Sequence, residues 1–360
     1  MSGRIVIMAG GTGGHVFPAL AVAQEMAARG WQVSWLGTQT GLEAKVVPAA
    51  GIDIDWLAVA GLRGKGLLAK VGGIVKLVQA CRQAKRILRE RRPDVVLGMG
   101  GFVAGPGGLM AKSLRIPLVI HEQNRVPGTT NRWLAKLAAT KILEAFPASF
   151  APNLGAECTG NPLRSGFSAL PDKQAWTPDA GRNLHILVLG GSQGAKVLNE
   201  TVPAALATLA NLEIKHQTGA AMQTEVAAAY RSTNLNAEVA AFIDDMAAAY
   251  RWADLIVCRA GAMTVSEVAA AGLPAIFVPL LYAIDDHQTA NAKYLADAGA
   301  ALLLPQPELN AENLRKTITQ AMTSLDSMSR AAKAKARLAA TQTVADICGA
   351  IAAPHAEAAR

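Results

Sequence analysis

The chain has 360 residues, of which 51% are hydrophobic and 17% charged, a composition that excludes a disordered chain and predicts a globular one. Its length predicts two domains, each large enough for its own core. A formal net charge of +8 favours anionic partners such as phosphates or lipid surfaces. Aromatic residues make up only 5% and do not alternate with basic ones, so we expect no nucleic-acid partner.

Short apolar runs alternate with helical patterns along the chain, which predicts an α/β fold of two Rossmann-like parallel-sheet domains. In chain order, the expected strands are 5–8, 31–36, 94–97, 117–121, 186–189, 212–217, 237–242, 255–258 and 275–278. The expected helices are 16–29, 67–91, 196–209, 225–230, 246–253, 263–271, 287–298, 310–321 and 329–352. This alternation puts helices on both faces of each sheet.

The segment 153–164 carries two glycines and a proline, which makes it the best linker candidate. We therefore expect one domain at 1–162 and a second at 163–340. A C-terminal helix and tail are expected at 341–360.

The N-terminus lacks the basic, apolar and cleavage regions of a signal peptide. The long uncharged stretches 95–111 and 268–284 are interrupted by glycine or proline, which argues against membrane-spanning helices. We therefore expect a cytoplasmic protein with peripheral membrane contact. The cysteines have neither metal-ligand nor redox spacing and are expected to be free thiols.

Each half opens with an apolar strand that ends in a glycine-rich turn. Residues 10–15 read Gly-Gly-Thr-Gly-Gly-His, and residues 190–194 read Gly-Gly-Ser-Gln-Gly. Such turns direct backbone N–H groups and a helix N-terminus at a phosphate. The dinucleotide fingerprint needs a third glycine where Val16 stands, so we expect phosphate binding without a dinucleotide. For the glycines of 98–105, phosphate binding and close packing are both open.

His15 lies at the start of the helix after the first turn. The positive end of a helix disfavours an imidazolium, which suits a neutral general base. The alternative is that the imidazole only caps or packs. Residues 121–124 read His-Glu-Gln-Asn and end a predicted strand, where so many polar side chains indicate a functional role. The alternative there is an ordinary loop surface.

The segment 259–267 reads Arg-Ala-Gly-Ala-Met-Thr-Val-Ser-Glu and follows a predicted strand. One interpretation makes Thr264 an N-cap, with Glu267 at capping-box spacing. The functional interpretation directs the helix N-terminus at a pyrophosphate, with Glu267 accepting hydrogen bonds from a ribose. Asp53 and Asp55 resemble a metal-binding pair, but an ordinary solvent-facing strand explains them, and no metal site is expected.

Residues 62–92 hold ten lysines and arginines against a single acid, Glu90, with apolar residues between them. Apolar residues flanked by cations describe a surface that lies on anionic lipid. For the helix body, a core-facing helix with a solvated basic face explains the pattern equally well. For the loop 62–68 we favour membrane contact.

Taken together, these motifs resemble one family over nearly the whole chain: the bacterial peptidoglycan glycosyltransferases that convert lipid I to lipid II. The resemblance rests on residues 10–15, 121–124, 160–164 (Gly-Asn-Pro-Leu-Arg), 190–194 and 261–267. It implies a GT-B fold, with the C-terminal helix crossing back to the first domain.

The resemblance also implies the reaction. N-acetylglucosamine would pass from UDP-N-acetylglucosamine, bound by the C-terminal domain, to the 4-hydroxyl of the muramoyl sugar of lipid I. Lipid I (undecaprenyl-diphospho-N-acetylmuramoyl-pentapeptide) would reach the N-terminal domain from the cytoplasmic face of the inner membrane. The transfer would invert the anomeric carbon, forming a β-1,4 link without a cofactor or metal ion. A cell-wall synthesis complex is an expected partner.

By the same resemblance, His15 is the candidate base and Glu122 the second choice. Glu267 would bind the ribose, and the backbone at Ile243 the uracil. Thr12, Gly13, Gly14 and His15 would line the acceptor side. The full set of expected substrate-binding residues is Thr12, Gly13, Gly14, Asn124, Arg164, Ser192, Ile243, Ala262, Met263, Thr264, Val265, Ser266, Glu267 and Gln288.

One departure from the family pattern is His287, which stands where the family has glutamine. Two other functions remain as alternatives. A UDP-N-acetylglucosamine 2-epimerase would turn over the nucleotide sugar alone. A nucleotide-sugar-binding membrane scaffold would not depend on His15.

Overall fold

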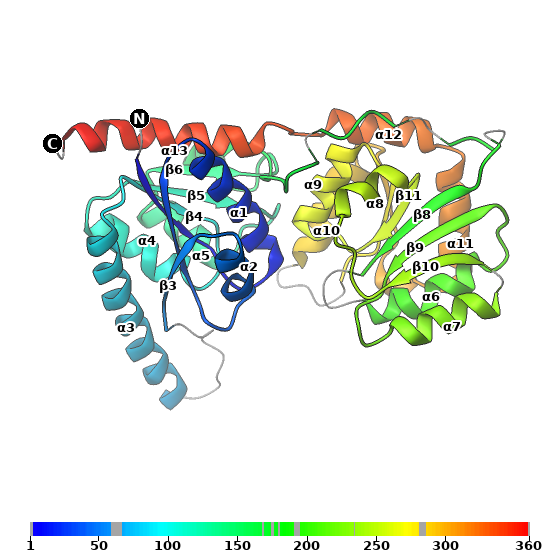
Figure 1. Cartoon of the computed structure of the whole chain (residues 1–360), viewed down its shortest axis with the longest axis horizontal. Coiled ribbons are helices and arrows are strands. Elements are labelled where there is room, and N and C mark those ends of the chain that lie inside the picture. Colours follow the sequence, from blue (N-terminus) through cyan, green and yellow to red (C-terminus); the bar gives the residue numbers. More distant parts are fainter. Residues whose placement is uncertain are drawn as a thin grey trace. The chain divides into compact units, whose positions relative to one another are not determined.

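The computed structural model describes residues 3–58, 67–167, 169–173, 176–178, 181–190, 195–233, 235–280 and 286–358. The chain divides into two compact units (Figure 1). Unit 1 comprises Met1–Ser165 and Ala339–Arg360, and unit 2 comprises Gly166–Leu338.

Unit 1 is a parallel sheet between helices, with strand order β3-β2-β1-β4-β5-β6-β7. Its strands are β1 (Arg4–Met8), β2 (Gln32–Gly37), β3 (Asp53–Trp56), β4 (Val95–Gly98), β5 (Leu118–Glu122), β6 (Lys141–Glu144) and β7 (Glu157–Cys158). Its helices are α1 (Gly13–Ala28), α2 (Glu43–Ala49), α3 (Leu67–Arg91), α4 (Ala104–Ser113), α5 (Thr129–Leu137), the short η1 (Pro152–Leu154) and α13 (Ala340–Ala358).

The alternation of side chains along β1 builds two cores. Ile5 and Ile7 pack into the cluster under α1, and Val6 and Met8 pack into the cluster on the other face of the sheet. The C-terminal helix α13 completes the first cluster, because its buried face packs with α1. Residues from the two ends of the chain therefore share one core (Figure 1).

Unit 2 repeats the architecture, with strand order β10-β9-β8-β11-β12-β13, again parallel. Its strands are β8 (Leu184–Leu189), β9 (Leu212–Gln217), β10 (Asn236–Ala240), β11 (Leu255–Cys258), β12 (Ala275–Phe277) and β13 (Ala301–Leu303). Its helices are α6 (Lys196–Leu206), α7 (Gln223–Ser232), α8 (Met246–Trp252), α9 (Ala262–Ala271), α10 (His287–Ala296), η3 (Gln306–Glu308), α11 (Ala311–Met322) and α12 (Leu325–Ala334).

The predicted fold class is confirmed, but several elements differ from the sequence-based expectation. Residues 157–158, expected within a linker, form the edge strand β7 of unit 1. The single helix expected at 329–352 is two helices, α12 and α13. In the part of the chain that the structure describes, no helix is both long and apolar enough to cross a bilayer.

Candidate functional site

In each unit the strand order reverses beside the first strand, between β1 and β4 and between β8 and β11. Doubly wound sheets bind ligands beyond the carboxyl ends of the strands at this switch point. In unit 1 the turn after β1 carries residues 10–12, and β5 ends in residues 121–122. The two polar motifs of unit 1 therefore belong to the same edge of its sheet.

A chain of hydrogen bonds joins these motifs. His15 Nδ1 lies 2.7 Å from Gln123 Oε1. The Gln123 amide nitrogen lies 3.1 Å from His121 Nδ1 and 3.0 Å from the His121 carbonyl oxygen. His121 Nε2 lies 2.9 Å from the carbonyl oxygen of Gly160, and burial lowers the pKa of this imidazole to about 4. The structure thus connects the half-buried His15 to a fully buried histidine.

The motif at 160–164 contacts the same hydrogen-bonded residues. Asn161 Nδ2 donates to the Gln123 carbonyl oxygen at 3.1 Å. The Arg164 guanidinium lies 5.1 Å from the ring centre of Phe17, one turn along α1 from the glycine-rich motif. Three motifs that are far apart in the sequence therefore meet within unit 1.

Glu122 is buried, and its carboxylate organises the loop that follows β5. One oxygen accepts from the backbone N–H of Asn124 at 2.9 Å and from its side chain at 3.3 Å. The other accepts from the N–H of Gly128 at 3.0 Å and from Asn131 Nδ2 at 2.9 Å. Both oxygens are thus engaged by the loop and by the start of α5.

The turn that carries Thr12, Gly13 and Gly14 is held by a residue that the sequence motifs did not reveal. Glu43 is fully buried, and its carboxylate accepts from the N–H of Gly11 at 2.9 Å and from the backbone and hydroxyl of Thr38 at 2.9 and 2.6 Å. Nothing in the local sequence marks this role, because Gly11 lies 32 residues away.

The glycines after β4 serve close packing. Gly100 has φ +101°, and a Cβ there would lie 2.9 Å from both Cε1 and Nδ1 of His15. A Cβ on Gly101 would lie 2.4 Å from the carbonyl oxygen of Gly10. These positions therefore let the chain after β4 approach the first turn and the imidazole.

In unit 2 the helix α9 begins directly after β11. Its N-cap is Gly261, with φ −61° and ψ 145°, so the helix starts at Ala262. The interpretation of Thr264 as an N-cap in a capping box is therefore wrong, because Thr264 already lies in the first turn. The first-turn N–H groups of a helix have no partner within the helix, so this end suits an anion.

Glu267 lies one turn further along α9 and is only 3% exposed. Tyr250 Oη, on α8, lies 3.4 Å from Glu267 Oε2. Ala262, Met263 and Val265 are also buried, with Val265 fully so. The segment thus places a carboxylate, rather than a cap, close to the positive end of its own helix.

Of the remaining expected donor residues of unit 2, Ile243 lies in the loop between β10 and α8, and Gln288 lies in the first turn of α10. The N–H of Ile243 donates to Gln217 Oε1 at 3.2 Å, and Gln288 Oε1 accepts from the N–H of Leu280 at 3.0 Å. Ser192 and residues 282–285 lie outside the described residues.

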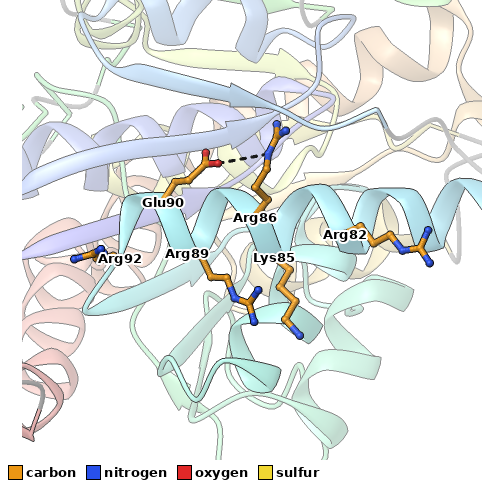
Figure 2. Close-up of a pocket in the computed structure, with 6 residues that line it drawn as sticks. All are labelled: Arg82, Lys85, Arg86, Arg89, Glu90 and Arg92. Carbon is orange, nitrogen blue, oxygen red and sulfur yellow. Dashed lines mark ion pairs between the residues drawn. The ribbon is translucent and has the colours of Figure 1, made fainter.

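The carboxyl-terminal half of α3 forms a basic surface. A shallow hollow there is lined by Arg82, Lys85, Arg86, Arg89, Glu90 and Arg92. Figure 2 shows Lys85 and Arg89 on one side of the helix, with Arg86 and Glu90 on the other, where they form an ion pair at 3.6 Å. Nearer the start of α3, Val75, Leu77 and Val78 are 51%, 40% and 44% exposed. The loop 59–66 lies outside the described residues.

Asp53 and Asp55 pair with an arginine. Arg91 donates to Asp55 at 2.8 and 3.2 Å and to Asp53 at 3.1 Å, and these bonds raise the pKa of Arg91. Among the residues that the structure describes, no three His, Cys, Asp or Glu side chains gather closely enough to hold a metal ion. The cysteines are free thiols, of which Cys258 and Cys348 are buried.

The chain matches two family models, the glycosyltransferase family 28 N-terminal domain over residues 5–143 and the C-terminal domain over residues 185–348. It is 60% identical over 353 residues to a protein of Methylococcus capsulatus, covering 97% of this chain and 98% of that protein. It is 52% identical over 354 residues to a protein of Nitrosococcus oceani, with the same shares of 97% and 98%.

Among solved structures, the chain resembles MurG of Acinetobacter baumannii, with a TM-score of 0.82 and 43% identity over 96% of this chain and 99% of that one. The glycosyltransferase of kitacinnamycin shares the fold, with a TM-score of 0.72 at 19% identity over 97% and 99% of the two chains. The relatives from Methylococcus and Nitrosococcus carry one name. The chain therefore belongs to glycosyltransferase family 28, in the family of UDP-N-acetylglucosamine--N-acetylmuramyl-(pentapeptide) pyrophosphoryl-undecaprenol N-acetylglucosamine transferases.

Proposed function

We propose that this chain transfers N-acetylglucosamine from UDP-N-acetylglucosamine to the 4-hydroxyl of the muramoyl sugar of lipid I, with inversion, and so forms lipid II. The observation that carries the proposal is that the motifs of unit 1 meet beside its switch point and that α9 begins after β11 at the switch point of unit 2, in a chain 60% identical to a transferase of that name. The fold alone would not select this substrate pair.

The donor is assigned to unit 2. The first turn of α9 (Ala262, Met263 and Thr264) suits the diphosphate, and the buried carboxylate of Glu267 suits the ribose hydroxyls. Since the N–H of Ile243 already donates to Gln217, its carbonyl oxygen is the group left for the uracil N–H. We assign Gln288 to the sugar hydroxyls.

The other expected residues complete the donor site. Val265 is fully buried and anchors the first turn of α9 to the core. Ser192 and Ser266 complete the assignment, and Asn124 and Arg164 are kept as donor-binding residues of unit 1.

The chemistry is assigned to the turn of Thr12, Gly13, Gly14 and His15. The acceptor oxygen forms a bond to the anomeric carbon while the bond from that carbon to the UDP oxygen breaks. The hydroxyl proton passes to the imidazole, and the bonding pair leaves with UDP. We favour His15 over Glu122 as the base, because both oxygens of Glu122 accept hydrogen bonds from its own loop and from the start of α5.

The test is an assay of the purified chain with radiolabelled UDP-N-acetylglucosamine and a lipid I analogue. Transfer of label to the lipid, with a β-1,4 link by NMR, is the expected result. An epimerase would instead convert the nucleotide sugar without the lipid. A binding scaffold would leave both substrates unchanged.

Replacing Gly100 with alanine is expected to lower the transfer rate by up to ~10²-fold, because the new methyl group would push the imidazole of His15 out of position. The left-handed backbone adds a strain of about 1–2 kcal/mol. Steady-state kinetics and a thermal melt measure the two effects separately.

Gly30→Ala is the matched control, since Gly30 has φ +81° and no atom lies within 4 Å of the position that the new methyl group would take. It should lose similar stability and keep its rate. Equal rates for the two variants would contradict the placement of His15.

We also propose that the chain binds the cytoplasmic face of the inner membrane peripherally, through α3, and works there within a cell-wall synthesis complex. The exposed apolar turn at 75–78 adjoins the basic surface of Figure 2, a combination that suits anionic lipid. Figure 1 shows the start of α3 extending beyond the sheet of unit 1.

The triple change of Arg82, Lys85 and Arg89 to glutamine is expected to weaken binding to anionic vesicles by ~10²-fold, at about 1 kcal/mol for each cation near the surface. Co-sedimentation with phosphatidylglycerol vesicles at low and high salt measures this affinity. The control changes the exposed Arg231, Arg315 and Arg330 of unit 2 to glutamine, which alters the net charge equally. Equal loss in both variants would show that net charge, and not α3, attracts the lipid.

A further inference from the structure

The hydrogen-bond chain behind His15 has only one consistent assignment of donors and acceptors. At its far end the carbonyl oxygen of Gly160 can only accept, so the facing Nε2 of His121 carries a hydrogen. His121 is fully buried and uncharged, because burial lowers its pKa to about 4. A neutral imidazole with a hydrogen on Nε2 has a lone pair on Nδ1.

The amide of Gln123 is therefore oriented. Its terminal group faces two acceptors of the same residue, His121 Nδ1 at 3.1 Å and the His121 carbonyl oxygen at 3.0 Å. Only the amide nitrogen, which has two hydrogens, satisfies both. If the amide were reversed, its oxygen would face His121 Nδ1 and the His121 carbonyl oxygen. All three atoms are acceptors, and such a buried contact is unfavourable. The oxygen Oε1 therefore faces His15, 2.7 Å from Nδ1.

Because Oε1 only accepts, His15 Nδ1 must carry a hydrogen, which leaves the lone pair of the neutral imidazole on Nε2. The backbone on both sides of this amide is also fixed. Asn161 Nδ2 donates to the Gln123 carbonyl at 3.1 Å, and Asn131 Nδ2 donates to the His121 carbonyl at 3.2 Å. The close approach of Gly100 confines the imidazole on another side.

We infer that Gln123, oriented by His121, is a positioning residue that holds His15 in the Nδ1–H tautomer and so makes Nε2 the basic nitrogen. This inference rests on the proposed function, since it names the atom through which His15 accepts the acceptor proton. Gln123 itself touches His15 and His121 and is assigned no contact with substrate.

The experiment compares the full-length wild type with Gln123→Met, which has a side chain of similar size and neither amide atom. Histidine side chains are labelled with ¹⁵N, and the His15 signals are identified by their loss in His15→Gln. In the wild type we expect a protonated Nδ1 and an unprotonated Nε2. In Gln123→Met we expect this preference to be lost, with at least a ~10-fold fall in kcat and an unchanged donor KM; a wrong tautomer at a histidine base costs up to ~10⁴-fold.

Two further variants separate positioning from folding. Gln123→Glu keeps an acceptor for the His15 Nδ1–H, but its second oxygen faces two acceptors of His121, so we expect it to restore the His15 tautomer and only part of the kcat lost in Gln123→Met. Gln223→Met removes an exposed amide of unit 2, which donates to the Val239 carbonyl, and is expected to leave both kcat and the His15 tautomer unchanged.

A hydrogen on Nε2 of His15 in the wild type, or an unchanged tautomer and kcat in Gln123→Met, would overturn the inference. Its failure is distinguishable from failure of the proposed function. The tautomer is read from the free protein, whereas lipid II formation by the wild type tests the transferase itself.

Discussion

His15→Ala is expected to lower kcat for lipid II formation by ~10²–10⁴-fold, the usual contribution of a positioned general base. The KM for UDP-N-acetylglucosamine should hardly change, because the donor is assigned to unit 2 whereas His15 lies in the first turn of α1 in unit 1. Loss of kcat without loss of donor binding is the signature of an interaction made in the transition state. Initial rates at varied donor and acceptor concentrations measure both parameters.

Glu122→Gln is the matched comparison, because Glu122 is the competing base. Its carboxylate accepts from Gly128 and Asn131, and an amide there would face one or more of these donors with its own N–H groups. We expect a loss of stability of about 1–3 kcal/mol, seen as a lower Tm, with kcat falling no more than the folded fraction. A specific loss of kcat in Glu122→Gln, with His15→Ala active, would reverse the assignment. Full lipid II formation by both variants would show that neither side chain is the base.

The sequence was sufficient to predict the parts of the fold that depend on local pattern. The alternation of Ile5, Val6, Ile7 and Met8 between two cores follows from a buried parallel strand, and the glycines after it marked the strand-to-helix turn. The same reasoning found β8 and the start of α9 in unit 2. These elements are the ones that build the switch points, so the sequence could also indicate where the candidate sites lie.

Elements fixed by distant packing were missed. The helix α4 begins Ala-Gly-Pro-Gly-Gly, a sequence of low helix propensity. The helix forms because its backbone must lie close to β1 and α5. A Cβ on Gly107 would lie 2.2 Å from the Met8 sulfur, and one on Gly108 would lie 2.7 Å from Leu134. Tertiary packing thus outweighs local propensity, and no pattern within α4 itself reports it.

In the candidate site, too, local features could be predicted from the sequence whereas contacts between distant residues could not. His15 was visible from its place at a helix start, but its partner Gln123 lies 108 residues away, and His121 is tied to Gly160 across 39 residues. The polar residues at the end of β5 indicated a functional site without indicating the role of each residue. For Thr264, capping-box spacing was misleading, because the helix is capped three residues earlier, at Gly261, and begins at Ala262.

Glu267→Ala is expected to weaken binding of UDP-N-acetylglucosamine by roughly 10²–10⁴-fold, since a hydrogen bond to a charged group contributes about 1.5–3 kcal/mol and the ribose offers two hydroxyls. The effect should fall on donor KM, because the ribose lies away from the reacting carbon and is bound alike in the ground state and transition state. Calorimetric titration with UDP and steady-state kinetics measure it.

A UDP analogue that lacks both ribose hydroxyls tests whether Glu267 binds the ribose. The wild type should bind UDP far more tightly than this analogue, and Glu267→Ala should bind the two almost equally, because the carboxylate that distinguishes them is gone. Tyr250→Phe is the control, since it removes the phenol oxygen 3.4 Å from Glu267 and keeps the carboxylate. That variant should lose at most ~10-fold in UDP affinity and retain the preference. A variant without Glu267 that still discriminated between the two ligands would place the ribose elsewhere and remove the central donor contact from the proposed function.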